Sequence, residues 1–247
     1  MNPILRTIVA VILFSGNSLL PAQAQNPVVV ELFTSEGCSS CPPADAVLLD
    51  LDRKAESSGA ELILLGEHVD YWNYIGWTDR FSSAQFSQRQ SDYARDFHLA
   101  SVYTPQMVID GREQLVGNDL AEVSNKIAAA RQETKPARVA LQWEANHRLH
   151  VSVQSVEAQR AQVLLAVTED GLSTQVGNGE NGGRTLHHAA VVRQLRPLGN
   201  LDNGKFDTRV EVSPHADWNA AALKVAILVQ DPASGKILGA AQIGYQP

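Results

Sequence analysis

Two cysteines three positions apart constrain the fold of this chain more than any other feature. They lie in Gly37-Cys38-Ser39-Ser40-Cys41-Pro42, after the β-rich run Val28 to Phe33 and before apolar residues at helical spacing. Cysteines this close can form a disulfide only where the backbone turns, and the start of a helix supplies such a turn. The unpaired N–H groups at a helix start also favour a thiolate. The spacing therefore predicts a strand, then a redox-active cysteine pair at a helix tip, then the helix.

The place of each cysteine predicts its part in thiol–disulfide exchange. Cys38, nearer the tip, is expected to be the exposed nucleophile, and Cys41 the more buried resolving thiol. No organic cofactor is required, because the disulfide Cys38–Cys41 itself carries two electrons. Regular helix should begin near Pro42, since a proline disfavours the helical conformation in the residue before it. Glu36 acts against activation, because an acid beside Cys38 raises its pKa.

Other uses of the two thiols stay open. A permanent bridge would stabilise the fold poorly, since so small a ring constrains little of the unfolded chain. The alternative function is a Cu(I)-binding protein that uses Cys38 and Cys41, because thiolates are soft ligands. A further alternative is a catalytically silent interaction module. No other metal site is predicted, and two cysteines exclude a four-cysteine metal site.

The remainder of the chain divides at Lys135-Pro136. Over residues 27–135, strand and helix patterns alternate in the order strand, helix, strand, helix, hairpin, helix, which is typical of an α/β domain. Over residues 136–247, short runs alternate apolar and polar residues and are separated by turn signals such as Asp170-Gly171. This pattern predicts an antiparallel β-sandwich as a C-terminal domain.

Thr104-Pro105 directly precedes the predicted strand Gln106 to Ile109. Together with the strand, cysteine pair and helix, this resembles the thioredoxin superfamily over about residues 28–133. The resemblance implies a cis-proline at Pro105 facing the cysteines, and backbone hydrogen bonds from Thr104 to an extended substrate. A closer resemblance is to an exported thioredoxin-like family, domain of unknown function twelve-twenty-three, which has no settled substrate. It is carried by four segments: Val30 to Asp45, His68 to Trp72, Tyr103 to Val108 and Gly179 to Leu186.

Three more side chains are candidates for a supporting role. The thioredoxin pattern has a buried acid where this chain has Leu32, one position after Glu31. A longer turn could place Glu31 under Cys41 as a proton acceptor; otherwise Glu31 points to the other face of the sheet. His68 and Trp72 follow the second predicted strand, so they could rim the thiols, His68 as acid or base and Trp72 as an apolar contact for a client.

Two motifs of the second half carry no predicted chemistry. His187 and His188 should not share a metal ion, because neighbours on a strand point to opposite faces; they are expected to be surface or core residues. The Gly/Asn-rich loop from Gly177 to Gly183 lacks the spacing and the lysine of a phosphate-binding loop.

The first 24 residues predict export. Met1 to Ala24 has a basic start, a short apolar run and Ala22-Gln23-Ala24 at its end, which are the parts of a secretory signal peptide. We therefore expect a periplasmic or secreted protein with no stable membrane span after signal removal. The net charge of −7 argues against nucleic acid as a partner. The leading hypothesis is an exported thiol–disulfide oxidoreductase whose partners are protein thiols and disulfides or a redox protein, with the direction of electron flow left open.

Overall fold

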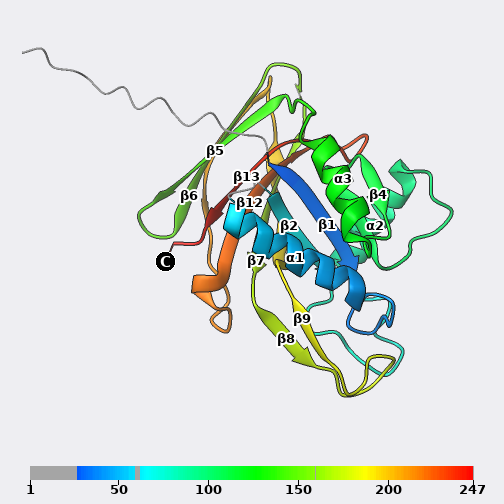
Figure 1. Ribbon diagram of the computed structural model, residues 1–247. Helices are drawn as coiled ribbons and strands as arrows, with labels where there is room; N and C mark the ends of the chain where they lie inside the picture. The colour runs from blue at the N-terminus through cyan, green and yellow to red at the C-terminus, as the bar shows by residue number, and fades with distance from the viewer. Residues whose placement is uncertain (1–26, 59–61, 159, 247) are drawn as a thin grey trace, which may run out of the picture.

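The first part of the chain alternates strands and helices in the predicted order (Figure 1). The computed structural model describes residues 27–58, 62–158 and 160–246; the predicted signal peptide, residues 1–24, lies outside them. No helix within these ranges is long and apolar enough to cross a membrane. The elements of the first part are β1 (Val28–Thr34), α1 (Pro42–Ser58), β2 (Leu62–His68), α2 (Ala84–Asp96), β3 (Gln106–Ile109), β4 (Glu113–Leu115) and α3 (Leu120–Ala130).

The second part consists almost entirely of strands. A 3-10 turn at Ala220–Ala222 precedes the last two of them. The strands are β5 (Ala137–Glu144), β6 (Arg148–Ser155), β7 (Gln162–Glu169), β8 (Leu172–Gln175), β9 (Thr185–His188), β10 (Val191–Asn200), β11 (Lys205–Glu211), β12 (Leu223–Gln230) and β13 (Ile237–Gly244).

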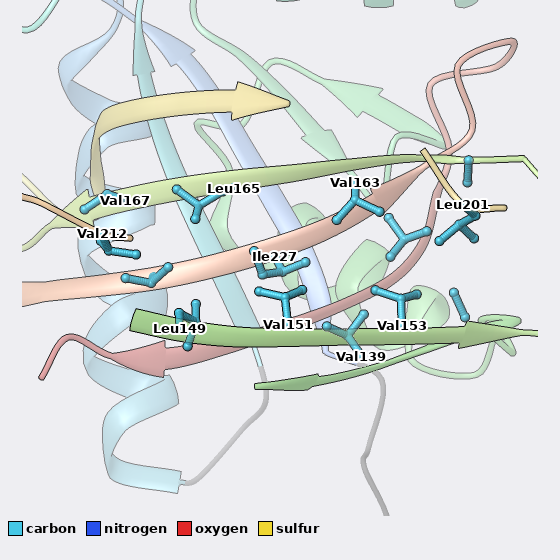
Figure 2. Packing of buried hydrophobic residues seen from close by; sticks show 14 of the residues in the cluster. Val139, Leu149, Val151, Val153, Val163, Leu165, Val167, Leu201, Val212 and Ile227 are labelled. Atoms are coloured by element: carbon cyan, nitrogen blue, oxygen red, sulfur yellow. The ribbon is translucent and has the colours of Figure 1, made fainter. Parts of the chain in front are cut away.

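Strands from both parts join in one mixed sheet, which differs from the expected pair of separate domains. Its eight strands lie in the order β13-β12-β7-β10-β2-β1-β3-β4, and β10 pairs parallel with β2 where Val191 lies opposite Gly66. β5, β6 and β11 form a smaller sheet that packs on β7 and β12 through a shared apolar core (Figure 2). The second part is therefore not a free-standing sandwich, because one of its two packed layers continues into the strands of residues 27–135.

Helices cover the β1 region on both faces. Alternate β1 residues such as Val30 and Leu32 pack with α1 and α3, whereas Phe33 packs with Tyr93 of α2. α1 presents Ala44, Val47, Leu48 and Leu51 at helical spacing to this core. Each fully buried Val or Leu contributes about 1.5–3 kcal/mol relative to an exposed one. This packing fixes α1 on the sheet and so fixes the turn that leads into it.

Three loops meet at the end of β1 and β2. The segment after β2 begins with Val69, whose N–H donates to the Thr34 carbonyl at 2.9 Å. The loop between β8 and β9 reaches the same place and lies beside the chain that enters α1 (Figure 1). The two cysteines lie where these loops meet.

Candidate functional site

Cys38 and Cys41 form a disulfide in the turn before α1. The Cys38 N–H donates to the Ser35 carbonyl at 3.1 Å, and the Cys41 N–H donates to the Cys38 carbonyl at 3.3 Å. The first helical residue is Pro42, and the Cys41 carbonyl accepts from the N–H groups of Ala44 and Asp45. The two Cα atoms are 5.4 Å apart. The lead-in turn and the helix start are thus where the proline pattern predicts them.

The expected exposure of Cys38 is wrong. Neither cysteine has accessible surface in the oxidised protein. Cys38 Sγ lies 3.3 Å from Ser40 Oγ and 3.4 Å from Thr104 Oγ1. Ser39 and Ser40 are themselves exposed. Cys38 is thus buried although it contacts the exposed Ser40.

The Thr104–Pro105 peptide bond is cis and lies against the disulfide. The Thr104 hydroxyl faces Cys38, and its position is set by the Trp72 indole, whose Nε1 donates to Thr104 Oγ1 at 2.8 Å. The Thr104 carbonyl accepts from Ser40 Oγ at 3.4 Å. Thr104 therefore contacts Cys38 directly, next to the cis-proline Pro105, and Trp72 reaches the site through its hydrogen bond to Thr104.

The loop between β8 and β9 holds the cysteine turn, which sequence reasoning missed. The buried Asn181 donates through Nδ2 to the carbonyls of Glu36 and Cys38, both at 2.9 Å. Its Oδ1 accepts from Arg184 at 2.8 Å, and the neighbouring Glu180 accepts from the Ser39 N–H at 3.1 Å. Two signals pointed to this loop: the segment Gly179 to Leu186 carries part of the family resemblance, and left-handed conformations at Gly179 and Gly183 shape the turn.

A cluster of buried polar side chains lies beside the turn. His68 Nδ1 lies 2.6 Å from Asp79 Oδ2, which also accepts from the Glu36 N–H at 2.9 Å. The carboxylate of Glu36 accepts from Trp77 Nε1 at 2.8 Å and lies 3.3 Å from His188 Nε2. The rings of His68 and His188 contact each other edge to face, with centroids 4.8 Å apart.

The predicted place of His68, at the rim of the thiols, is wrong. Its side chain is buried and bonded to Asp79, so His68 does not rim the thiols. Burial lowers the pKa of His68, but Asp79, together with Asp45 and Glu36, outweighs this effect and the net shift is upward. Burial likewise raises the pKa of Asp79, yet His68 holds the net value below the ordinary one. His188 is a core residue and His187 is exposed, because neighbours on a strand point to opposite faces.

Asp45 is a further buried acid that sequence reasoning missed. It lies four residues after Cys41 in the first turn of α1, a spacing that puts both side chains on one face of the helix. Burial raises the pKa of Asp45, and the charges of His188 and His68 act in the opposite direction. The i, i+4 spacing of Cys41 and Asp45 was the signal that could have found it.

Glu31 faces away from the cysteines, so its proposed place under Cys41 is wrong. It lies on the α2 face of the sheet, where its carboxylate accepts from Arg89 Nε at 2.6 Å and from the Tyr93 hydroxyl at 2.5 Å. Leu32 takes the position toward α1. The alternation of β1 leaves no other arrangement, because adjacent strand residues point to opposite faces.

Within residues 27–58, 62–158 and 160–246, no group of three or more His, Cys, Asp or Glu side chains is arranged to hold a metal ion. The chemistry that the arrangement supports is centred on the two sulfurs. Cys38 Sγ has the hydroxyls of Ser40 and Thr104 beside it, and the buried carboxyl group of Asp45 lies one helical turn after Cys41.

Comparisons with known proteins identify a family and similar solved structures. The crystal structure of protein AGR_C_4864 from Agrobacterium tumefaciens is 30% identical, with a TM-score of 0.74, and the match covers 92% of this chain and 98% of that one. A domain of the outer membrane lipoprotein Omp28 from Porphyromonas gingivalis is 12% identical, with a TM-score of 0.29 over 46% of this chain and 90% of that one. The latter likeness is too weak to bear on fold or function. No curated protein matches the chain. The chain belongs to the family described as "Protein of unknown function (DUF1223)", whose sequence model matches residues 29–230.

Proposed function

We propose that the protein is an exported thiol–disulfide oxidoreductase, acting in the periplasm or after secretion. The observation that carries this proposal is the Cys38–Cys41 disulfide at the start of α1, with Thr104 of a cis Thr104–Pro105 bond 3.4 Å from Cys38 Sγ. A disulfide between residues so close in sequence closes a very small loop and adds little stability. Its placement against a backbone segment that can receive a partner favours exchange chemistry.

The arrangement of the first part supports a thioredoxin-like fold. The strands lie in the order β2-β1-β3-β4, with β1 parallel to β2 and antiparallel to β3. α1 and α3 pack on one face of these strands and α2 on the other. This agrees with the order of elements that the resemblance to the thioredoxin superfamily implies, with the cysteine pair after the end of β1 and the cis-proline just before the start of the antiparallel β3.

In the proposed reaction, reduced Cys38 attacks a sulfur of a client disulfide as a thiolate. The client S–S bond breaks, one client sulfur leaves as a thiolate, and a mixed disulfide joins Cys38 to the other. The Cys41 thiol then loses its proton, and its thiolate attacks Cys38 Sγ. The Cys38–Cys41 bond forms, the second client sulfur leaves as a thiolate, and two electrons have passed to the client. The reverse sequence oxidises a client dithiol.

Binding of the client requires a rearrangement at Ser40. The Ser40 hydroxyl covers Cys38 Sγ and at the same time occupies the Thr104 carbonyl. A client backbone N–H that donates to the Thr104 carbonyl would replace the serine and uncover the sulfur in one movement. Trp72 lies beside this position and would contact the client's apolar side chains.

The proposal is tested by client trapping and by a redox titration. The Cys41→Ser variant should accumulate mixed disulfides through Cys38 in cells, and the matched Cys38→Ser/Cys41→Ser variant should accumulate none. The purified wild-type protein should show a reversible two-electron transition in a thiol–disulfide buffer, read by alkylation of free thiols. Absence of both the trapped clients and the transition would refute the proposal. Stoichiometric copper retained against a competing chelator, without reductase or oxidase activity, would establish a Cu(I)-binding protein instead.

A further inference from the structure

Two hydrogen bonds in series link the indole of Trp72 to the sulfur of Cys38. Trp72 Nε1 donates to Thr104 Oγ1 at 2.8 Å, and Thr104 Oγ1 in turn donates to Cys38 Sγ at 3.4 Å. An indole N–H can only donate, whereas a hydroxyl has one hydrogen and two lone pairs. Trp72 therefore occupies a lone pair of Thr104 Oγ1 and leaves the hydrogen of that hydroxyl for another acceptor.

Two acceptors are within reach of the Thr104 hydrogen, Cys38 Sγ and the hydroxyl oxygen of Tyr71. Tyr71 gives its own hydrogen to Gln90 Oε1 at 2.9 Å. Burial raises the pKa of Tyr71 to about 12, although hydrogen bonds with Thr104 and Gln90 lower it, so Tyr71 is a neutral acceptor. Hydrogen bonds to a charged acceptor are roughly twice as strong as those to a neutral one. Formation of a Cys38 thiolate therefore favours donation to the sulfur over donation to Tyr71.

The second hydroxyl beside the sulfur, that of Ser40, is held differently. Ser40 is exposed, and its Oγ lies 3.3 Å from Cys38 Sγ while it donates to the Thr104 carbonyl at 3.4 Å. A client backbone that takes this carbonyl displaces Ser40 from the sulfur. Thr104 is half-buried and receives its hydrogen bond from Trp72 on another side, so its hydroxyl stays beside Cys38 while the client binds.

Charged groups around the cysteine turn also act on a Cys38 thiolate. The Ser40 N–H and the positive end of α1 favour it, as does the positive charge of Arg184, which donates to Asn181 Oδ1 at 2.8 Å. All these groups are the same in the wild type and in variants of Thr104 and Trp72, so they cancel when the variants are compared. The remaining titratable groups are Glu36, Asp45, Asp79, Glu180, His68, His188 and Cys41.

We infer that the Thr104 hydroxyl donates a hydrogen bond to the Cys38 thiolate and that Trp72 is a positioning residue, which fixes the direction of this hydroxyl. The inference rests on the proposed function and deepens it, because Trp72 then acts on the nucleophile as well as on the client. In the proposed reaction the negative charge lies on Cys38 Sγ before the sulfur attacks the client disulfide. A donor already aimed at the sulfur stabilises this charge without first having to reorient. Since the donor lies beside Cys38, it favours Cys38 over Cys41 as the thiolate.

The test measures the pKa of Cys38 in the reduced protein. The rate of alkylation by iodoacetamide is followed against pH, and mass spectrometry identifies the alkylated cysteine. Thr104→Val removes the hydroxyl but keeps the shape of the side chain, and it should raise the pKa of Cys38 by about one unit, because a hydrogen bond to a charged group corresponds to roughly one to two pKa units. Thr104→Ser keeps the hydroxyl and should leave the pKa at its wild-type value.

A double-mutant cycle tests the role of Trp72. Trp72→Phe should raise the pKa of Cys38 by about half a unit, because the Thr104 hydroxyl is then free to turn away from the sulfur. In the Thr104→Val background the same change should have no further effect, since the hydroxyl through which Trp72 acts is gone. The matched control is Trp143→Phe, which removes an indole N–H that donates to the Gly244 carbonyl at 2.8 Å and should leave the pKa unchanged.

A measurement that leaves Trp72 in place covers the case in which Trp72→Phe does not fold. In the reduced wild-type protein, the ¹⁵N resonance of the Trp72 indole should titrate with the pKa of Cys38, and Thr104→Val should remove most of this response.

The inference is overturned if Thr104→Val leaves the pKa of Cys38 unchanged, if Thr104→Ser raises it as much as Thr104→Val does, or if the indole resonance does not titrate with Cys38. An effect of Trp72→Phe that persists in the Thr104→Val background also overturns it, because a merely structural role gives additive shifts. A failure of the proposed function is distinct. The wild-type protein would then show no reversible thiol–disulfide transition, whereas the pKa of Cys38 is measured on the reduced protein alone.

Discussion

Replacement of Asn181 by alanine tests whether the β8–β9 loop holds the cysteine turn. The side chain is buried and donates to the carbonyls of Glu36 and Cys38 while it accepts from Arg184. A buried carbonyl left without its donor costs about 1–3 kcal/mol. The Cys38 carbonyl keeps a hydrogen bond from the Cys41 N–H, so its loss should be at the lower end. We therefore expect Asn181→Ala to lower the free energy of unfolding by about 2–4 kcal/mol.

Urea unfolding of the oxidised protein, followed by circular dichroism and tryptophan fluorescence, measures this change. The matched control is Asn178→Ala, which alters an exposed asparagine of the same loop and should change the free energy by less than about 0.5 kcal/mol. In the reduced protein, Asn181→Ala should also speed alkylation of Cys38, because the turn that buries it is released. An unfolding midpoint equal to that of the wild type would refute the reasoning, as would equal effects of the two variants.

Three further predictions concern buried charges. Lys135→Met should lower the free energy of unfolding by about 3–5 kcal/mol, because Lys135 lies 2.6 Å from the buried carboxylate of Asp110, which would lose its cationic partner. Urea titrations measure this change, and a value below about 1 kcal/mol would contradict the prediction. The wild-type protein should lose stability as the pH rises from about 6.5 through the raised pKa of His68, because protonated His68 is stabilised only in the folded state. The melting temperature measured against pH should show this loss, and Asp79→Asn should abolish it. If Asp45 accepts the proton of the Cys41 thiol, Asp45→Asn should lengthen the lifetime of the mixed disulfide at neutral pH, because the resolving thiol then loses its proton more slowly. At a pH high enough to ionise Cys41 without help, the variant and the wild type should resolve the mixed disulfide equally fast. Equal slowing at every pH would exclude this role of Asp45.

The local parts of the site could be predicted from sequence. The strand, the cysteine pair and the prolines define the turn before α1, because each acts on the residues next to it. The cis-proline and Thr104 followed from the resemblance. The exposure of Cys38 could not be predicted in the same way, since its cover comes from Ser40 folding back onto Thr104, a contact between residues far apart in the chain.

Long-range placements account for what the sequence analysis missed. Glu31 and Asp45 are both buried acids near Cys41 in sequence, so either could have been the acid beside Cys41. The alternation of β1 turns Glu31 to the opposite face of the sheet, where it bonds Arg89, whereas Asp45 lies in the first turn of α1 next to Cys41. The second part was expected to be a separate sandwich because its short runs alternate apolar and polar residues between turn signals. The middle of β7 and the middle of β12 are nevertheless continuous apolar runs. Such runs occur in any strand that is covered on both faces, so they do not reveal that β10 pairs with β2.

The pairing of β10 with β2 has a consequence for how the protein is made. When β2 has been synthesised, the strand that will lie against its free edge does not yet exist, and neither does the loop that carries Asn181 and Glu180. The turn that carries the cysteines therefore lacks its contacts with Asn181 and Glu180 until most of the polypeptide has emerged. Any cell that produces this protein has to keep two reactive sulfurs from premature partners during that interval.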